Sequence, residues 1–550
     1  MPDLVFRGNL NAATWPFLST QQGRSVIIGQ LDTNASKFAQ FGGRDADRDV
    51  GIPQALFMQN VFPTAHGFQS VGFAEKIPGI YSGLGRAFDK AFIIKDIEDR
   101  KTILSPGAGY MYIYDAMTAA WDTKLTFPLG DLGFNKNITT AYVQDRQFVC
   151  FANKGTFEYD FVAGTFTQVT LTALTDSLIV GIGASNGYLI AFGTGNLLYW
   201  SSLTDPTDFS PSILTGAGSG SIVDLRGSLT AVLPVSGGFI VYSTENAVFA
   251  SYTGNIYIPW NFKEISGSGG VVYSEHVTYE SNLSFHYAWT SKGLLKVEKN
   301  VAAPIHPEVT DFITGKIMED FNYSTDVLAQ IKTSTQLVVK LTHVGGRYLI
   351  ISYGQASFTH ALVYDEILAR WGKLKIDHAD CFSWPTPNVY GEVTYQDLLD
   401  LLETYEDLLY TSYSDLFNVQ YTVTRAKEDI AFLTTYGQVV TVNFDLGDDT
   451  DEGVLFLGKF QVVRNNDFTL HAVDIESVDD SSTSFELAIL TSYDGKTLAS
   501  LTTAPVEVLS VANLRRFETR VTGINHTLRV TGSFALDSIV LEGINSGQRG

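Results

Sequence analysis

Cysteine and charge are both scarce in this 550-residue sequence. Its two cysteines, Cys150 and Cys381, lie far apart, which excludes a disulfide framework and a CxxC metal site. We therefore expect two small buried side chains in a protein that is assembled in a reducing cytoplasm. Charged residues make up 17% and hydrophobic residues 45%, a balance that excludes a disordered chain and indicates a packed globular protein.

Basic residues are the scarcer kind of charge. Lysine and arginine total 37 against 59 aspartates and glutamates, which gives a formal net charge of −22. Such a chain repels the phosphate backbone, and this excludes a generic nucleic-acid binder. It does not exclude a protein past which DNA slides, because an acidic wall keeps DNA from adhering.

Long apolar runs are missing as well. Residues 1–7 show no basic segment that leads into an apolar one, so we expect no signal peptide. The most apolar stretch, Ser177–Gly195, is interrupted by Asn186 and by several glycines. It predicts two strands and a turn rather than a membrane span.

Catalytic motifs are also absent. None of the nine histidines forms an HExxH pair, and no GxSxG nucleophile elbow occurs. The glycines of Gly216–Gly220 do not follow the GxGxxG spacing of a phosphate loop, so we interpret them as a glycine loop between strands. Paired carboxylates for glycoside cleavage come from distant segments, and the sequence leaves them open. We predict no enzyme, and no catalytic, cofactor-binding or metal-binding residues.

Three acidic segments resemble known loops only in part. Asp45–Gly51 resembles a calcium loop, but its glycine comes one place late and Leu56 stands where the loop needs glutamate. The acids of Asp448–Glu452 are a better cation candidate, although a solvated linker is the default interpretation. Ser492–Thr497 resembles an Asp-box, but a tight Asp-Gly hairpin turn explains it without chemistry.

Glycine and aromatic residues are abundant, with 49 Gly, 26 Tyr and 36 Phe, which favours an all-β protein. Three segments repeat one pattern, in which a Tyr-Asp pair is followed by an aromatic residue six positions after the aspartate. The segments are Tyr114-Asp115 with Trp121, Tyr159-Asp160 with Phe166, and Tyr364-Asp365 with Trp371. The pattern predicts a hairpin in which the aspartate bonds the turn amides and the aromatic residue opens the return strand.

The spacing of these hairpins indicates a larger repeat. Asp115 and Asp160 lie 45 residues apart, and weaker strand–turn–strand echoes follow at similar intervals. Repeats of roughly 40–50 residues with four short strands are typical of propeller blades. We therefore predict a β-propeller of six or seven blades over residues 71–450, with a β-sandwich as the alternative.

The two ends of the chain show other patterns. Residues 1–70 are polar, glycine-rich and poor in alternation, so we predict an N-terminal arm. Residues 451–550 contain alternating runs separated by turns, which predict a C-terminal β-sandwich.

Residues 392–424 carry seven acids and no lysine or arginine. They contain three Tyr-x-Asp-Leu units, whose tyrosines and aspartates are Tyr395, Asp397, Tyr405, Asp407, Tyr413 and Asp415. We predict a partly helical insertion between two propeller strands and name these six residues as a candidate interaction surface, either for docking or as a gate that lines a channel. An acidic solvated loop is an equally good interpretation.

Several phrases resemble a family of β-propeller proteins from the tails of short-tailed bacteriophages, variously called packaged-DNA stabilisation, tail hub or nozzle proteins. Leu56–Phe73 resembles their N-terminal phrase, and Trp200–Phe209 with the glycines that follow resembles a phrase of their middle blades. The triple Tyr-x-Asp-Leu insertion resembles their repeated aromatic-Asp-Asp-Leu tract. Thr527–Glu542 resembles their closing strands. Tyrosine in place of tryptophan in the insertion, and the unusual first 50 residues, leave open which tail ring this is.

The resemblance implies a structural virion protein without catalytic residues or cofactors. It implies a homo-oligomer, a hexameric ring attached below the portal and adaptor proteins of the tail. Such a ring prolongs the DNA channel and retains packaged DNA until ejection, while DNA passes transiently and without specific binding. Two rivals remain open: a propeller glycosidase or lyase that acts on surface polysaccharide, and a receptor-binding adhesin.

Overall fold

The computed structural model describes the β-framework of the chain and the shorter connections within it. The described residues are 25–28, 55–64, 68–77, 90–95, 101–107, 110–115, 120–126, 138–160, 165–193, 196–314, 337–355, 357–386, 427–434, 437–444, 453–460, 466–477, 485–492, 509–510, 516–523 and 525–548. Within these ranges the fold is all-β, apart from one short α-helix, α1 (Pro307–Ile313), and two turns of 3-10 helix, η3 (Asp176–Leu178) and η4 (Ser274–His276).

The three Tyr-Asp segments form the hairpins that their sequences predict. In each hairpin the tyrosine pairs with the aromatic residue of the return strand: Tyr114 with Trp121, Tyr159 with Phe166, and Tyr364 with Trp371. In both the second and third hairpins the two ring centroids are 4.8 Å apart. Such cross-strand aromatic pairs stabilise an antiparallel sheet, so one local pattern recurs as one local structure.

Asp365 shows why an aspartate ends this pattern. Its Oδ1 accepts hydrogen bonds from the backbone N–H groups of Ile367 at 3.0 Å and Leu368 at 3.1 Å. The carboxylate is buried and also accepts hydrogen bonds from the Arg347 guanidinium, the shortest at 2.6 Å. The aspartate therefore closes the turn, as expected from the sequence.

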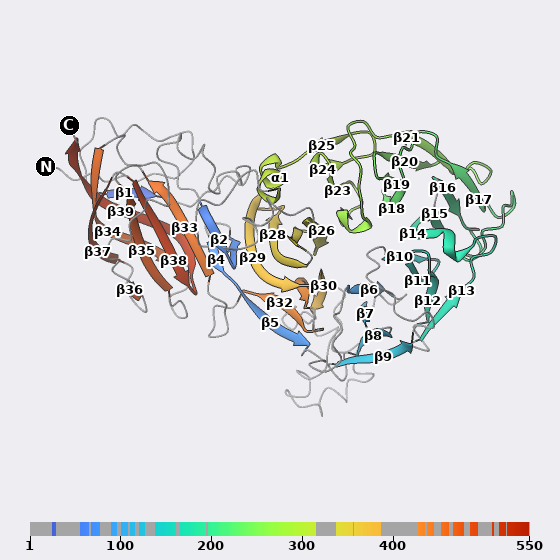
Figure 1. The fold of residues 1–550 in the computed structure, drawn as a ribbon, viewed down its shortest axis with the longest axis horizontal. Helices are drawn as coiled ribbons and strands as arrows, with labels where there is room; N and C mark the ends of the chain where they lie inside the picture. Colours follow the sequence, from blue (N-terminus) through green and yellow to red (C-terminus); the bar gives the residue numbers. More distant parts are fainter. Residues whose placement is uncertain are drawn as a thin grey trace, which may run out of the picture.

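Seven four-stranded antiparallel units follow one another along the described chain, and they form a ring in Figure 1. Unit 1 contains β6 (Phe92–Lys95), β7 (Lys101–Gly107), β8 (Tyr110–Asp115) and β9 (Ala120–Thr126). Unit 2 contains β10 (Ile138–Val143), β11 (Arg146–Phe151), β12 (Gly155–Asp160) and β13 (Thr165–Val169). Unit 3 contains β14 (Ile179–Ser185), β15 (Tyr188–Gly193), β16 (Leu197–Trp200) and β17 (Gly218–Ser221). Unit 4 contains β18 (Leu229–Val235), β19 (Gly238–Ser243), β20 (Ala247–Tyr252) and β21 (Trp260–Glu264).

The remaining three units complete the ring. Unit 5 contains β22 (Val277–Tyr279), β23 (His286–Thr290), β24 (Gly293–Val297) and β25 (Ala302–Pro304). Unit 6 contains β26 (Leu337–Val344), β27 (Tyr348–Gln355), β28 (Phe358–Asp365) and β29 (Arg370–His378). Unit 7 contains β30 (Asp380–Thr386), β31 (Lys427–Leu433) and β32 (Val439–Asn443), with β5 (Gly72–Ile77) as its fourth strand. The first strand of each unit faces the middle of the ring, and this arrangement is propeller-like.

The ring is closed by a strand from the other end of the sequence. β5 precedes unit 1 in the chain but pairs with β32 of unit 7, with Thr441 opposite Ala74 and Val442 opposite Phe73. The Phe73 ring also packs edge-on against Phe432 of β31, with centroids 6.1 Å apart. Closure therefore joins residues that are more than 350 positions apart in the sequence.

Unit 6 is part of a larger sheet. A ten-stranded sheet runs from β26 to β29 and then through β3 (Val61–Pro63), β4 (Phe68–Ser70), β39 (Ala535–Gln548), β34 (Asn466–Ser477) and β37 (Arg516–Gly523), with β1 (Ser25–Ile28) paired to β39. Gly372 makes the passage from the ring possible, because a Cβ there would lie 2.6 Å from the Val61 carbonyl oxygen. This sheet joins the ring to the C-terminal strands.

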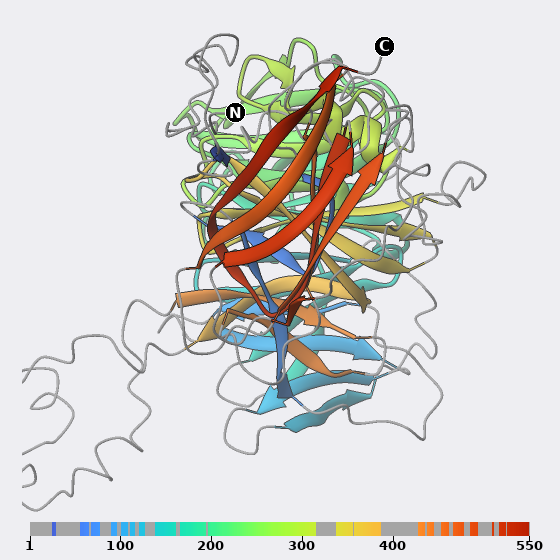
Figure 2. The same cartoon turned by 90° about the vertical axis from the view of Figure 1, so that its left-hand side faces the viewer.

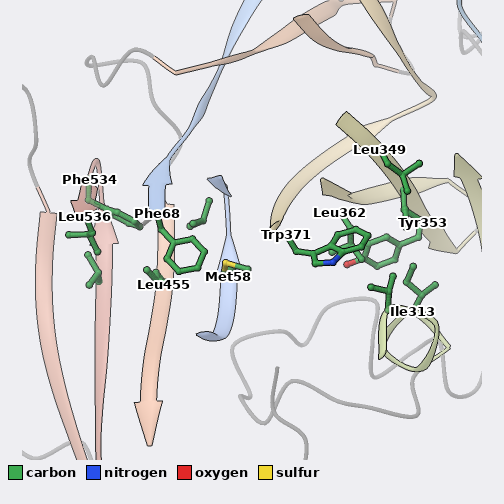
Figure 3. Close-up of a cluster of buried hydrophobic side chains, with 14 of the residues drawn as sticks. Met58, Phe68, Ile313, Leu349, Tyr353, Leu362, Trp371, Leu455, Phe534 and Leu536 are labelled. Carbon is green, nitrogen blue, oxygen red and sulfur yellow. The ribbon is translucent and has the colours of Figure 1, made fainter. Parts of the chain in front are cut away.

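The C-terminal strands form two layers (Figure 2). One layer is the part of the ten-stranded sheet that β39, β34 and β37 form, with β1 paired to β39. The other is a five-stranded sheet of β2 (Ala55–Gln59), β33 (Gly453–Phe460), β38 (Asn525–Gly532), β35 (Phe485–Ser492) and β36 (Leu509–Ser510). One apolar cluster reaches from these layers into unit 6, from Leu536 through Met58 to Trp371 and Leu349 (Figure 3).

Some of the segments that the sequence singled out lie within the described residues, and others do not. The stretch Ser177–Gly195 contains the two predicted strands, β14 and β15, with Asn186 in the turn between them. Residues 55–70 of the expected arm supply β2, β3 and β4, which belong to the sheets of the main body. The insertion 392–424, the possible calcium loop, the Asp448–Glu452 linker and most of the Asp-box lie outside the described residues.

Candidate functional site

The inner strands of the ring surround a central cavity of about 980 Å³. It is lined by residues of β10, β14, β18, β22, β26 and β30, together with the residues just before β6. Polar groups, among them Gln144, Asn186 and Ser236, line the end at which the inner strands turn into their hairpins, together with the acidic Asp145. Lys90, Glu275, Lys340 and Asp380 line the end at which several of these strands begin. This end holds two lysines and two carboxylates, which form two ion pairs.

Asp380 connects three units at that end. As the first residue of β30 it accepts a hydrogen bond from the Ala91 backbone N–H at 2.9 Å, which links unit 7 to unit 1. It also accepts hydrogen bonds from the Lys340 ammonium of unit 6 and from the Cys381 N–H at 2.7 Å. Its side chain is 1% exposed. These donors satisfy the hydrogen-bonding capacity of a carboxylate that burial has removed from water.

Lys90 and Glu275 form the second pair. The Lys90 Nζ of unit 1 lies 3.4 Å from the Glu275 Oε2 of η4, which precedes unit 5. Their side chains, 12% and 7% exposed, therefore join two units that are not neighbours in the ring. The four groups together are neutral, with two ammonium groups and two carboxylates.

Burial affects the two lysines differently. The pKa of Lys90 is lowered, chiefly because burial disfavours the ammonium, although Glu275 opposes this. Burial also disfavours the charged form of Lys340, but the attraction of Asp380 and its hydrogen bond outweigh burial and raise the pKa of Lys340. A lysine with a lowered pKa in a cavity is a candidate for chemistry, whereas the raised pKa of Lys340 and its ion pair with Asp380 suit a structural link between two units.

A second polar cluster lies between units 5 and 6. The Tyr287 hydroxyl donates to Glu366 Oε1 at 2.5 Å, and His343 Nε2 lies 3.3 Å from the same oxygen. Burial and the bond to Glu366 raise the pKa of Tyr287. Burial opposes ionisation of Glu366, but the bonds from His343 and Tyr287 outweigh it and lower the pKa of that carboxyl group. The tyrosine remains a neutral donor, so the cluster serves to join two units.

The described residues contain no group of three or more His, Cys, Asp or Glu that could hold a metal ion. Cys150 and Cys381 are both free and buried, as the sequence predicted. Burial raises the pKa of the Cys150 thiol to about 12 and raises that of Cys381 as well. Thiols in this state are poor nucleophiles.

The expected glycine loop at Gly216–Gly220 is wrong in part, because Gly218 and Gly220 belong to strand β17 and only Gly216 and Ala217 precede it. Gly216 has a positive φ of 76°, and its carbonyl oxygen accepts a hydrogen bond from the Trp200 indole at 2.9 Å. A Cβ at Gly218 would lie only 3.0 Å from the same indole. These glycines therefore allow Trp200 to lie flat against the last strands of unit 3.

The six Tyr and Asp residues that the sequence singled out lie outside the described residues. Their segment connects Thr386 to Lys427, which pair with each other where β30 ends and β31 begins. The sequence did not predict a role for Lys90, Glu275, Lys340 or Asp380. None of them lies in a local motif, and only closure of the ring brings them together.

No protein-family model and no curated protein matches this sequence. Among solved structures, the chain is similar to the extracellular domain of a protein classed as a hybrid two-component system from B. thetaiotaomicron. The identity is 9% and the TM-score 0.38, and the match covers 87% of this chain and 59% of that one. A likeness this distant carries no argument about function. Among the described residues, no helix is both long and apolar enough to span a membrane.

Proposed function

We propose that this chain is a structural virion protein of a short-tailed phage tail, a nozzle or hub component. In this proposal the ring is a seven-bladed β-propeller, the C-terminal layers are a β-sandwich, and the insertion connects two strands of the seventh blade. Copies of the chain form a ring below the portal and adaptor proteins, extend the DNA channel and retain packaged DNA until ejection. The protein is assembled in the host cytoplasm and acts without a cofactor.

One observation carries the proposal: the N-terminal and C-terminal phrases that resemble the tail family pack against each other. Gln69 of β4 pairs with Ala535 of β39, and Phe68 pairs with Leu536. The Ser70 hydroxyl accepts a hydrogen bond from the Phe534 N–H at 2.8 Å, and the Ser70 N–H donates to the Phe534 carbonyl oxygen at 2.8 Å. Phrases from opposite ends of the sequence thus form the joint between ring and C-terminal layers.

The middle phrase is also a structural unit. In the connection that follows Trp200, Asp205 Oδ1 accepts a hydrogen bond from the Thr207 N–H at 2.9 Å and an ion pair from Arg146 of unit 2 at 3.2 Å. Asp208 accepts hydrogen bonds from Thr172 and from the Ser210 N–H. These bonds lower the pKa values of both aspartates, with the backbone N–H contributions the largest. These contacts join the connection in unit 3 to unit 2. The phrase therefore has a structural role, as the proposal requires.

The DNA channel of this proposal is enclosed by several copies, since the Lys90–Glu275 and Lys340–Asp380 pairs occupy one end of the cavity within a single chain. A net charge of −22 on each copy would keep passing DNA from adhering, because no counterions are released from the phosphates.

The mass of the purified chain, measured with and without the upstream tail proteins, tests the proposal. We expect a ring, alone or when those proteins are added. A chain that stays monomeric and never joins them contradicts the proposal.

The glycosidase or lyase alternative rests on Glu275 and Asp380, two carboxylates that line one cavity. Both are ion-paired with lysines, which suits structural links better than a proton donor with a raised pKa. Cleavage of a surface polysaccharide by the purified wild-type chain would favour this alternative. Binding of the isolated chain to intact host cells would favour an adhesin.

A further inference from the structure

The turns of unit 4 lie on two opposite sides of the ring. Turn Ser236–Gly237 joins β18 to β19 on the side where the inner strands turn into their hairpins, and turn Thr244–Asn246 joins β19 to β20 on the side where these strands begin. The six residues of β19 separate the two turns by roughly 20 Å, since a strand rises about 3.3 Å per residue. We call the first side the turn face and the second the entry face.

Three exposed apolar side chains gather on the turn face: Leu214 at 89%, Tyr257 at 68% and Ile258 at 64% exposure. The connection after β20 reaches this face, because the Tyr252 N–H donates to the Gly237 carbonyl oxygen at 3.0 Å. The connection that carries Leu214 lies beside it, because a Cβ on Gly216 would be 3.0 Å from Ile256 Cγ1. The three side chains therefore form one apolar patch, the turn patch, of the kind that marks a contact site.

Hydrogen bonds fix the shape of the turn patch. Asn255 Oδ1 accepts a hydrogen bond from the Tyr257 N–H at 2.9 Å, and the Asn255 N–H donates to Thr253 Oγ1 at 3.0 Å. The Leu214 N–H donates to Ser212 Oγ at 3.2 Å. The exposed side chains thus stand on ordered turns, so a partner would bind them at little cost in conformational entropy.

A second apolar patch, the entry patch, lies on the entry face and consists of Val223, 92% exposed, and Val272, 54% exposed. Both residues lie next to the turn between β19 and β20. Asp224, which follows Val223, accepts a hydrogen bond at its carbonyl oxygen from Asn246 Nδ2 at 2.8 Å. Val271, which precedes Val272, donates its N–H to the Ser243 carbonyl oxygen at 2.8 Å. The surroundings of unit 4 therefore carry an apolar patch on each face.

The charges beside the two patches are complementary. On the turn face, Lys299 lies beside the first turn, because its Nζ would be 3.9 Å from a Cβ on Gly237. On the entry face, the exposed acids Asp224 and Glu245 lie beside the entry patch. Opposite charges favour contact between the two faces, whereas like charges disfavour contact of the entry face with another entry face.

Neighbouring charges are partly neutralised within the chain. Asp205, on the connection that carries Leu214, is ion-paired with Arg146 at 3.2 Å. Arg226, which follows the entry patch, is ion-paired with Glu264. The complement of each face, an apolar patch with the opposite charge beside it, is thus present on the chain itself. This indicates a second copy of the chain as the occupant of each patch.

We propose that the turn face of one copy binds the entry face of the next copy, so that the turn patch and the entry patch bury each other. Such a head-to-tail contact uses two different surfaces, and it closes into a ring or continues as a filament according to the rotation between copies. Units 3 and 4 lie at the end of the molecule opposite the C-terminal layers (Figure 1). The inference rests on the proposed function, because the closed case is the tail ring, and it names the surfaces that build this ring.

Sedimentation of the purified full chain over a range of concentrations tests the contact. We expect self-association that increases with concentration. We expect Leu214→Glu with Tyr257→Glu, and separately Val223→Glu with Val272→Glu, to weaken it at least about tenfold, because apolar area is lost and charge is brought into the contact. Ile367→Glu is the matched control, because Ile367 is 72% exposed in the turn between β28 and β29, and we expect it to leave the association unchanged.

A mixture of the two double variants tests whether the contact is head-to-tail. Each variant keeps one intact patch, so we expect each alone to remain monomeric and the mixture to form a one-to-one pair that grows no further. An entry-patch variant that associates like the wild type would mean that turn patches bind each other, and this result overturns the proposal. A mixture that forms no pair overturns it as well.

The outcomes separate this inference from the proposed function. A wild-type chain that is monomeric at every concentration, yet joins the upstream tail proteins, shows that another protein covers the patches. That result disproves the inference and leaves the proposed function intact. A chain that associates through the two patches but joins no tail protein keeps the contact and counts against the proposed function.

Discussion

Asp380 shows how much a single residue can depend on the whole fold. Its carboxylate accepts hydrogen bonds from Ala91, Lys340 and Cys381, and only Cys381 is near it in the sequence. Nothing in the local sequence distinguishes it from the other acids. Asp365 is the opposite case, because its role in a turn follows from its place after a tyrosine at the end of a strand.

Replacement of Asp380 by asparagine should destabilise the protein strongly. The variant keeps the size of the side chain but leaves the Lys340 ammonium buried without its counter-charge, which costs about 3–5 kcal/mol of unfolding free energy. Urea unfolding measures this loss. Glu298→Gln is the control, because its ion pair with Lys296 is half-exposed and such pairs contribute about 0–1 kcal/mol. Equal effects for the two variants would show that the cavity pairs do not hold the ring together.

Two buried histidines make stability depend on pH. Burial lowers the pKa of His286 and that of His378 from 6.5 to about 4. The unfolded chain therefore takes up protons below pH 6.5 that the folded chain refuses until about pH 4, so stability falls as pH falls through this window. Each histidine contributes a slope of at most about 1.4 kcal/mol per pH unit.

His286→Gln tests this dependence, because glutamine does not take up the proton. Whatever its stability at neutral pH, the variant should lose less free energy than the wild type between about pH 7 and about pH 5. Urea unfolding at several pH values measures both slopes. Identical slopes would mean that His286 is not the buried neutral group that its contacts with Tyr242 and the Pro234 carbonyl oxygen indicate.

At the scale of strands and sheets, the local pattern predicted much of the fold. Each Tyr-Asp hairpin needs only a strand, a turn and an aromatic partner, all within about a dozen residues, so the sequence displays it directly. The strands expected after residue 453 are present for the same reason, as alternation is a local property. Closure by β5 is different: its partner β32 lies far away in the sequence, and its own six residues say nothing of where they pair.

Gly372→Ala tests the junction between β29 and β3. A Cβ at this position would lie 2.6 Å from the Val61 carbonyl oxygen, so the strands must separate, at a cost of about 1–3 kcal/mol. Hydrogen exchange should rise in β3 and β4 before it rises elsewhere. Gly220→Ala is the control, since a Cβ there meets Trp200 only at 3.4 Å, an ordinary contact. If both variants exchange like the wild type, the continuous ten-stranded sheet is wrong.

At the scale of the whole molecule, the ring and the C-terminal layers share one sheet and one apolar core. Leu349 of unit 6 and Leu455 and Leu536 of the two layers belong to the same buried cluster. The sequence predicted two domains because its pattern changes near residue 450. It did not predict that residues 55–77 contribute strands to both, because edge pairing between distant segments leaves no periodic signal.

This shared core should make unfolding a single cooperative transition. No tryptophan follows Trp384, and the tryptophans from Trp121 to Trp384 lie in the ring, so with Trp15 replaced by phenylalanine indole fluorescence reports on the ring. Hydrogen exchange in β35 reports on the C-terminal layers. We expect the two transitions to coincide in urea, as they do when parts of a protein unfold together. Two separate midpoints would show that the layers form an independent domain.

The central claim is that this chain is a building block of a virion tail. Electron microscopy of virus particles produced with a label fused to this chain tests the claim most directly. The account predicts label on the axis of the short tail, in a ring below the head. Purified particles that carry no label, or that carry it only away from the tail, would contradict the account.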